Sequence, residues 1–274
     1  MKSFFVWFIA IFITLSAAVY QRLTGPTYPK RIKIEVKGTE YKFKLLRSHG
    51  GTTNAPIELK GVDETFNAKV FYRRYPTRDT FMVADMQYGN QVLTGMLPNL
   101  PPAGKYEYYI ELYKDGQTIP IVKDKHVVIR FKGEVPRYIL FPHIFFMFFA
   151  MLLSNLAAIM AISKIDKYKF FAYITLICLT LGGLILGPLV QYFAFGEFWT
   201  GVPFGWDLTD NKTLIGFLGW LVAVLVIRKN NKPVFVVIAA VLLLLVYSIP
   251  HSMFGSELNP VTGEIIQGFI PLVF

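Results

Sequence analysis

The chain of 274 residues is poor in charge and almost free of cysteine: 17% of its residues are charged, and Cys178 is its single cysteine. One cysteine excludes a disulfide-rich scaffold and a CxxCH haem attachment. The 54% of hydrophobic residues excludes a disordered chain. Walker, dinucleotide-binding, GxSxG and HExxH motifs are also lacking. The sequence therefore carries no catalytic signature, which leaves enzymatic activity open and favours a role without one.

Acidic residues are scarce as well, with 18 Asp and Glu against 28 Lys and Arg and a net charge of +10. Such a charge can indicate nucleic-acid binding, but its location argues otherwise. Residues 21–137 hold 20 of the cations and 12 of the acids. A polar middle between apolar ends is typical of a membrane protein with a water-soluble insert. We therefore expect a lipid bilayer as partner and no nucleic acid.

Long runs without a charged residue flank this polar middle. A helix needs roughly 20 mostly apolar residues to cross a bilayer, because its backbone must satisfy its own hydrogen bonds there. The runs that meet or approach this length are 3–21, 138–163, 170–196, 213–227 and 233–250. The fourth run is short, and Lys212 and Arg228 at its ends can extend it by snorkelling. We predict a membrane helical bundle of about five spans, four of them within residues 137–250.

The first run has two interpretations. Residues 1–22 suit an N-terminal transmembrane anchor that stays attached to the protein. Lys2, the apolar stretch 4–15 and the small residues 16–18 also suit a secretory signal with a cleavage site. We favour the anchor, and the signal stays an alternative.

Positive charge in the short loops predicts the orientation. The loop between the second and third spans carries Lys164, Lys167 and Lys169, and the loop between the fourth and fifth carries Arg228, Lys229 and Lys232. Loops rich in Lys and Arg favour the cytoplasmic side, so the insert, the loop 197–212 and the tail 251–274 are expected outside. The cations that follow the first span oppose this orientation, and the inverted topology stays open.

Residues 28–136 follow a β pattern. Residues 31–36 alternate charged and apolar side chains, which is the period of a half-buried strand. Further strands are predicted at 41–46, 67–73, 80–85, 91–97, 105–113, 117–122 and 126–131. About eight short strands in this length indicate an all-β, immunoglobulin-like sandwich. The insert has no cysteine, which excludes a blue-copper site, and its histidines, His49 and His126, are interpreted as surface residues.

Polar side chains gather in two stretches expected on the outer face, the loop 197–212 and the tail 251–274. They form a candidate polar site: Glu197, Asp207, Asp210, Lys212, His251 and Glu257. Either loop aspartate can also cap the helix that follows. An ion-pair network between loop and tail is the plainer alternative to a reactive centre. Trp199 and Trp206 suit the membrane interface and offer a surface for a lipid or small molecule.

Two histidines lie near the outer ends of predicted spans, His143 after Pro142 and His251 after Pro250. Imidazoles on facing helices can ligate the iron of haem b, or a metal ion together with a nearby carboxylate. No spacing motif accompanies them, so a hydrogen-bonded histidine inside the bundle is the plainer alternative. Haem b or a metal ion is therefore a possible cofactor of a redox or quinol-reactive membrane protein.

Two segments carry a resemblance to known sequences: WTGxPFGxDLTDNKT at 199–213 and PHSxxGSEL at 250–258. They resemble a group of bacterial inner-membrane proteins that has no assigned activity. The resemblance implies a protein of the bacterial inner membrane, and the orientation predicted from the loop charges then places the β domain and the tail in the periplasm. With no catalytic signature, we expect a subunit or accessory protein of an envelope complex. It would dock membrane or periplasmic protein partners through the sandwich and the outer loops.

Overall fold

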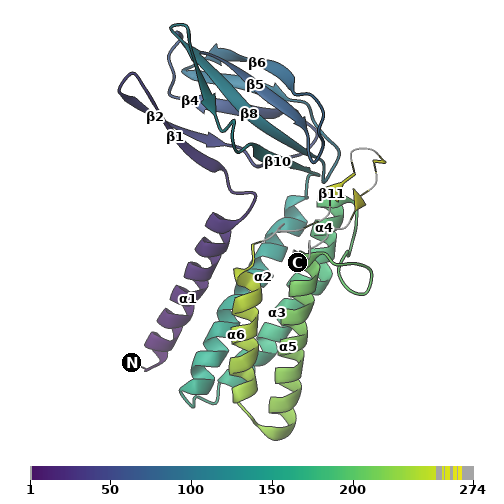
Figure 1. The fold of residues 1–274 in the computed structure, drawn as a ribbon. Coiled ribbons are helices and arrows are strands. Elements are labelled where there is room, and N and C mark those ends of the chain that lie inside the picture. Colours follow the sequence, from purple (N-terminus) through teal and green to yellow (C-terminus); the bar gives the residue numbers. More distant parts are fainter. Residues whose placement is uncertain (1, 251–254, 256, 260–261, 264, 267–274) are drawn as a thin grey trace. The chain divides into compact units, whose positions relative to one another are not determined.

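The structure is a computed structural model and describes residues 2–250, 255, 257–259, 262–263 and 265–266. The chain divides into two compact units. A helical unit runs up to Pro26 and from Val135 to Gly255, and a β unit comprises Thr27–Glu134 and Ser256–Ile266. Figure 1 labels the helices and strands.

The helical unit is built from long apolar helices. They are α1 (Lys2–Thr24), α2 (Arg137–Ile162), α3 (Tyr168–Leu179), the π-helix η1 (Thr180–Leu186), α4 (Gly187–Phe195), α5 (Leu208–Asn230) and α6 (Val234–Ser248). The ranges Phe4–Thr24, Arg137–Ile162, Tyr168–Phe195 and Leu208–Asn230 are long and apolar enough to cross a membrane. Four of the predicted spans are therefore present at spanning length.

The fifth predicted run forms a shorter helix than expected. α6 has 15 residues, which is about 22 Å at the rise of an α-helix and less than the roughly 30 Å of a bilayer core. Its side chains nevertheless belong to the core, since Val236 and Leu243 are buried. α6 also packs closely on α5, because a Cβ added at Gly216 would meet Leu243 at 2.7 Å.

Hydrogen bonds within the helical unit show which segments share an end of the bundle. The Tyr168 hydroxyl donates to Asn231 Oδ1 at 2.9 Å, which joins the loop after α2 to the loop after α5. At the other end, Gln21 Nε2 donates to the carbonyl of Tyr247 at 2.6 Å. The two basic loops therefore lie together, and the C-terminal ends of α1 and α6 lie together at the opposite end.

α1 is packed into the bundle through one face. Val6 and Ala10 are buried, and the Trp7 ring meets the Phe171 ring edge-on at 5.8 Å. The buried Thr14 hydroxyl donates to the Ala10 carbonyl and accepts from Asn155 Nδ2 at 3.0 Å. Inside a membrane such polar pairs join helices, so this packing favours the anchor over the cleavable signal.

We therefore expect the protein isolated from membranes to retain residues 1–22. Cleavage after the small residues 16–18 would remove Val6, Ala10 and Thr14 and leave Asn155 without its partner. Intact-mass spectrometry of the purified protein measures this directly. A mass that lacks the first helix would contradict the anchor.

The β unit contains every strand among the described residues. They are β1 (Lys30–Val36), β2 (Thr39–Leu45), β3 (Ser48–Gly50), β4 (Ala55–Lys60), β5 (Asn67–Arg74), β6 (Met82–Gly89), β7 (Val92–Leu97), β8 (Lys105–Lys114), β9 (Gln117–Ile121), β10 (Val127–Lys132), β11 (Glu257–Leu258) and β12 (Ile265–Ile266). All eight predicted strands are present within a few residues of the expected bounds. β3, β4, β11 and β12 were not predicted, and Pro56 in β4 is a residue that normally argues against a strand.

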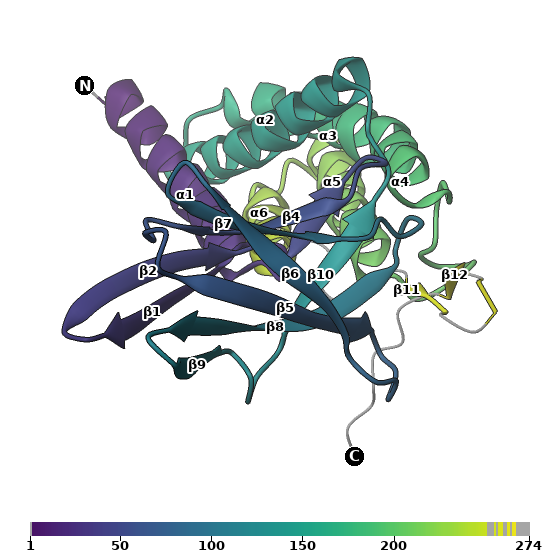
Figure 2. The same cartoon turned by 90° about the horizontal axis from the view of Figure 1, so that it is seen from above.

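Eight of these strands form one curved, nearly closed, barrel-like sheet that is not clearly the expected sandwich. The sheet runs β3-β10-β8-β5-β6-β7-β4, with β9 beside β8, while β1 and β2 form a separate hairpin. Figure 2 shows β8, β5 and β6 side by side. β6 pairs with β5 through Met82–Met86 and with β7 through Gln87–Gly89. This change of partner continues the sheet around its core where a sandwich would have two separate layers.

The central strand β8 is covered on both faces. Tyr108 and Ile110 point into the core with the buried rings of Phe43 and Phe66, and the Tyr108 hydroxyl donates to the Leu46 carbonyl at 2.8 Å. Residues on the other face of a strand are usually hydrated when a sheet has one core. Here the opposite face also contains buried side chains, and one of them is the carboxylate of Glu107.

Candidate functional sites

The first candidate site lies where α5 begins, and we call it the α5 entry site (Thr200, Asp207, Asp210 and Lys212). Asp207 is the N-cap of α5: its carboxylate accepts from the backbone N–H of Thr209 at 2.7 Å. An aspartate suits this position because the first amides of a helix lack partners and the helix dipole favours negative charge there. The backbone N–H of Asp207 donates to the Thr200 carbonyl at 3.0 Å, which folds the preceding loop back onto the helix.

Asp210 holds this loop in place from the first turn of α5. Its side chain is buried, with 5% exposed. Its Oδ2 accepts from the Thr200 N–H at 2.6 Å, the Gly201 N–H at 3.1 Å and the Thr200 hydroxyl at 3.2 Å. The same hydroxyl accepts from Gln191 Nε2 at 2.6 Å. One carboxylate therefore satisfies three donors and links α4, the loop and α5.

The loop approaches α5 so closely at Gly201 that only glycine fits there. A Cβ at this position would lie 2.7 Å from Asp210 Cβ and 2.8 Å from Asn211 Oδ1, which is closer than van der Waals contact permits. Asn211 Oδ1 is itself engaged, because it accepts from the Val202 N–H at 2.8 Å. Two neighbouring side chains of α5 thus bind the backbone of three consecutive loop residues.

Lys212 is the one lysine in the described residues whose side chain is this deeply buried, at 2% exposed. Its ammonium donates to the Ile249 carbonyl at 2.6 Å and interacts electrostatically with the Asp207 carboxylate. An ammonium group buried in a helical bundle requires such partners, because removing it from water is costly. Lys212 therefore joins the start of α5 to the end of α6.

The other residues predicted for this site are placed differently. Glu197 and Trp206 are exposed, and Trp199 Nε1 donates to the Val202 carbonyl at 3.1 Å within the loop. Glu257 belongs to the β unit, where its carboxylate pairs with Lys105. Burial lowers the pKa of Lys105, and the Glu257 carboxylate opposes that shift. His251 lies outside the described residues. The structure thus brings together Asp207, Asp210 and Lys212 from the predicted set.

His143 occupies a second position of interest, beside the π-helix η1. Its Nδ1 lies 2.9 Å from the carbonyl of Gly182, and a carbonyl only accepts, so Nδ1 carries a proton, and in the neutral ring Nε2 has the lone pair. π-helical turns are rare and frequently occur at functional sites. Within the described residues no group of three His, Cys, Asp or Glu side chains is arranged to hold a metal ion.

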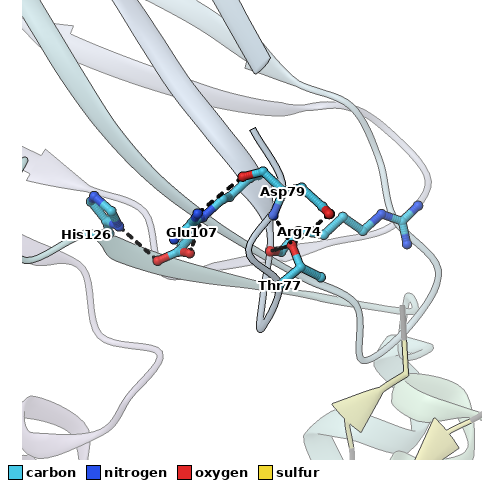
Figure 3. Close-up of polar contacts among 6 residues, drawn as sticks. Arg74, Thr77, Asp79, Glu107 and His126 are labelled. Atoms are coloured by element: carbon cyan, nitrogen blue, oxygen red, sulfur yellow. Dashed lines mark hydrogen bonds and ion pairs between the residues drawn. The ribbon is translucent and has the colours of Figure 1, made fainter. Parts of the chain in front are cut away.

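A third cluster lies in the β unit and centres on Glu107 (Figure 3). In the sheet register Arg73 of β5 stands opposite Glu107 of β8, and β10 runs on the other side of β8. Glu107 Oε1 accepts from Arg73 Nε at 2.6 Å, and Oε2 accepts from His126 Nδ1 at 2.9 Å. Arg73 Nη1 also donates to the Asp79 carbonyl at 3.2 Å. We call Arg73, Glu107 and His126 the Glu107 network.

Aromatic rings enclose the Glu107 network. The Tyr109 ring is stacked on His126 at 5.4 Å and on Phe71 at 4.8 Å. The Phe81 ring meets Tyr109 and His126 edge-on, and the Arg73 guanidinium lies 4.5 Å from its centroid. Cation–π contact and ring packing both shield the ion pair from water. His126 is therefore a partly buried member of a network, where the sequence had suggested a surface residue.

The Glu107 network and the α5 entry site are built in the same way. Both satisfy charged groups by hydrogen bonds between distant segments, which is the arrangement of a structural network. No protein-family model matches the chain, and no curated protein matches it. The functional conclusion therefore depends on the geometry of the chain itself.

Proposed function

We propose that the protein is an integral membrane subunit or accessory protein of a bacterial envelope complex, and that its β unit docks a partner protein in the periplasm. Four helices of spanning length support the membrane assignment. The cations of the loops after α2 and α5 support a cytoplasmic position for that end of the bundle. α6 then returns to the periplasmic side as a fifth, short span, which its packing on α5 supports.

The observation that carries the docking proposal is the exposure of strand β6. Met82 and Val83 are 45% and 51% exposed although neighbouring residues point to opposite faces, so β6 has apolar side chains in water on both faces. Tyr88 on the same strand and Met96 on β7 are exposed as well. Several apolar side chains exposed on neighbouring strands of one small domain support contact with another protein.

Crosslinking in the native membrane, followed by mild detergent extraction and purification, tests this proposal. We expect the wild-type protein to elute with a crosslinked partner and Val83→Lys to lose it. The matched control is Gln87→Lys, which adds the same charge at an exposed position of the same strand. A wild-type protein that remains a lone, stable monomer and forms no crosslink would contradict the proposal.

A second candidate function is a haem- or metal-dependent redox protein that uses His143. The supporting observation is the Nδ1 hydrogen bond to Gly182, because metal-ligating histidines usually donate their other nitrogen to a carbonyl or carboxylate. The residues that would complete the ligand set include His251, which is outside the described residues. A Soret band, or stoichiometric metal, that disappears in His143→Leu would favour this function over docking alone. Colourless, metal-free protein would remove it.

A further inference from the structure

The hairpin formed by β1 and β2 presents an unusual pairing of like charges. In its register Arg31 stands opposite Lys44, and Lys33 stands opposite Lys42. All four side chains are exposed, and those of Lys33 and Lys42 are each 68% exposed. Like charges directly opposite one another destabilise a hairpin. The hairpin thus gives up stability to hold four cations on one face.

The other face of the hairpin fixes which way these cations point. Val36, Phe43 and Leu45 are buried in the core of the β unit, and Ile32 and Ile34 pack against it. Because successive side chains alternate in direction, burial of this apolar face leaves the charged face on the surface of the β unit. The basic face is therefore held rigidly in place.

Acidic residues neutralise this basic face only in part. Glu40 lies 3.4 Å from Lys33 Nζ and 3.0 Å from Lys42 Nζ, so one carboxylate is shared by two ammonium groups. The remaining acid of the face, Glu35, stands opposite Glu40. Both ion pairs are exposed and contribute little free energy, so an external anion can compete for the lysines.

More positive charge is gathered at the base of the hairpin. Lys30 donates to the Lys125 carbonyl at 3.0 Å, and burial together with the charges of Lys125 and Arg47 lowers the pKa of the Lys30 ammonium. Arg31 donates to the Tyr28 hydroxyl at 2.6 Å, with its guanidinium 5.5 Å from the ring centroid. Cations and an aromatic residue thus occur together at the start of β1.

Chain length keeps the start of this hairpin close to the membrane. α1 ends at Thr24 and β1 starts at Lys30, and six residue steps cover at most about 20 Å. Basic segments next to a transmembrane helix are attracted by anionic lipids within roughly a Debye length. Proximity to the bilayer is therefore a consequence of covalent connection.

We propose that the exposed basic face of the β1–β2 hairpin (Arg31, Lys33, Lys42 and Lys44) binds the anionic phosphate-bearing headgroups of the membrane that α1 enters. The phosphates replace the weak contacts of Lys33 and Lys42 to Glu40 and relieve the repulsion within the two like-charge pairs. The proposal depends on the membrane assignment of the proposed function, and it is independent of whether β6 docks a protein.

Full-length protein in nanodiscs provides the test. A fluorophore on Thr39→Cys, at the tip of the hairpin, reports docking through its protection from a soluble quencher. We expect the ratio of docked to free hairpin to rise as phosphatidylglycerol replaces phosphatidylcholine, and to fall at high salt. Each cation near the surface is worth about a fivefold change in this ratio, so Lys42→Ala with Lys44→Ala is expected to lower it about 30-fold.

The control replaces two exposed lysines elsewhere in the β unit, Lys60→Ala with Lys69→Ala, and removes the same net charge. We expect this control to leave the ratio unchanged. Removing Lys42 and Lys44 also removes cross-strand repulsion, so the hairpin is expected to remain folded. Equal docking in neutral and anionic nanodiscs, or equal loss in both double variants, would overturn the proposal.

A competition experiment distinguishes binding to lipid headgroups from binding to a soluble phosphate. Inorganic phosphate or soluble glycerophosphoglycerol, added at matched ionic strength, is expected to leave docking intact because the bilayer presents many headgroups at once. Complete competition by either would assign the face to a soluble anion and overturn the lipid proposal. Incorporation into nanodiscs itself reports membrane insertion. A protein that does not incorporate would contradict the membrane assignment, whereas a protein that incorporates without docking would contradict only the lipid proposal.

Discussion

Replacing Asp210 with alanine is expected to lower the unfolding midpoint of the helical unit by roughly 10 °C. The substitution removes the acceptor of the Thr200 and Gly201 amides and of the Thr200 hydroxyl, all in a buried site. Leaving several buried donors without partners costs about 3–4 kcal/mol, and 1 kcal/mol shifts the midpoint of a unit this size by roughly 2–4 °C. Thermal unfolding of the detergent-solubilised protein, followed by tryptophan fluorescence, measures the change.

Two companion variants make this expectation specific. Asp210→Asn keeps one carbonyl oxygen as acceptor, so its midpoint should fall between those of wild type and Asp210→Ala. Glu197→Gln changes an exposed acid of the same loop and should have no measurable effect. Equal midpoints for Asp210→Ala and Glu197→Gln would show that the bonds of Asp210 do not hold the loop.

Glu107→Ala is expected to destabilise the β unit by about 2–3 kcal/mol. It leaves the Arg73 guanidinium and the His126 ring without their common acceptor in a partly shielded site. The expected loss of stability is smaller than that for breaking a fully buried ion pair, because the side chains of Arg73 and His126 are each 23% exposed. Hydrogen exchange of the β5 and β8 amides in the full-length protein reports the free energy of opening of this sheet.

The matched control is Glu111→Ala on the same strand. Glu111 accepts from Lys123 at 2.9 Å and from the Tyr113 hydroxyl at 2.8 Å, and the lysine is 53% exposed, so this loss should be smaller than that of Glu107→Ala. If the two alanine variants raise exchange of β5 and β8 equally, the Glu107 network has no special role in the sheet.

Strand positions could be predicted because alternation is a local property. The alternating charged and apolar residues of 31–36 form β1, and the tyrosine-rich segment 105–113 forms β8. β4 was missed because Pro56 reads as a strand breaker, although its burial alternates regularly. The change of partner along β6 has no local signal, since it depends on register between segments distant in the chain. That register produces the curved sheet where a sandwich was expected.

In the candidate sites, too, contacts between residues near in sequence could be predicted, and contacts between distant segments could not. Capping of α5 by Asp207 follows from helix-start rules and was among the predicted roles. The bonds from Asp210 to Thr200 and Gly201 require a loop closure that spacing alone does not specify. The Glu107 network joins residues 34 positions apart through strand pairing, and a single histidine after a lysine offers no pattern by which to find it.

Cysteine accessibility in intact cells tests the membrane architecture most directly. The native Cys178 is buried, so single cysteines can be introduced at the exposed positions Asp166, Glu197 and Asn230. We predict that a membrane-impermeant reagent modifies Glu197→Cys and leaves Asp166→Cys and Asn230→Cys unmodified until the membrane is opened. Modification of Glu197→Cys and Asn230→Cys from the same side would show that α5 does not cross the membrane, and would contradict the account.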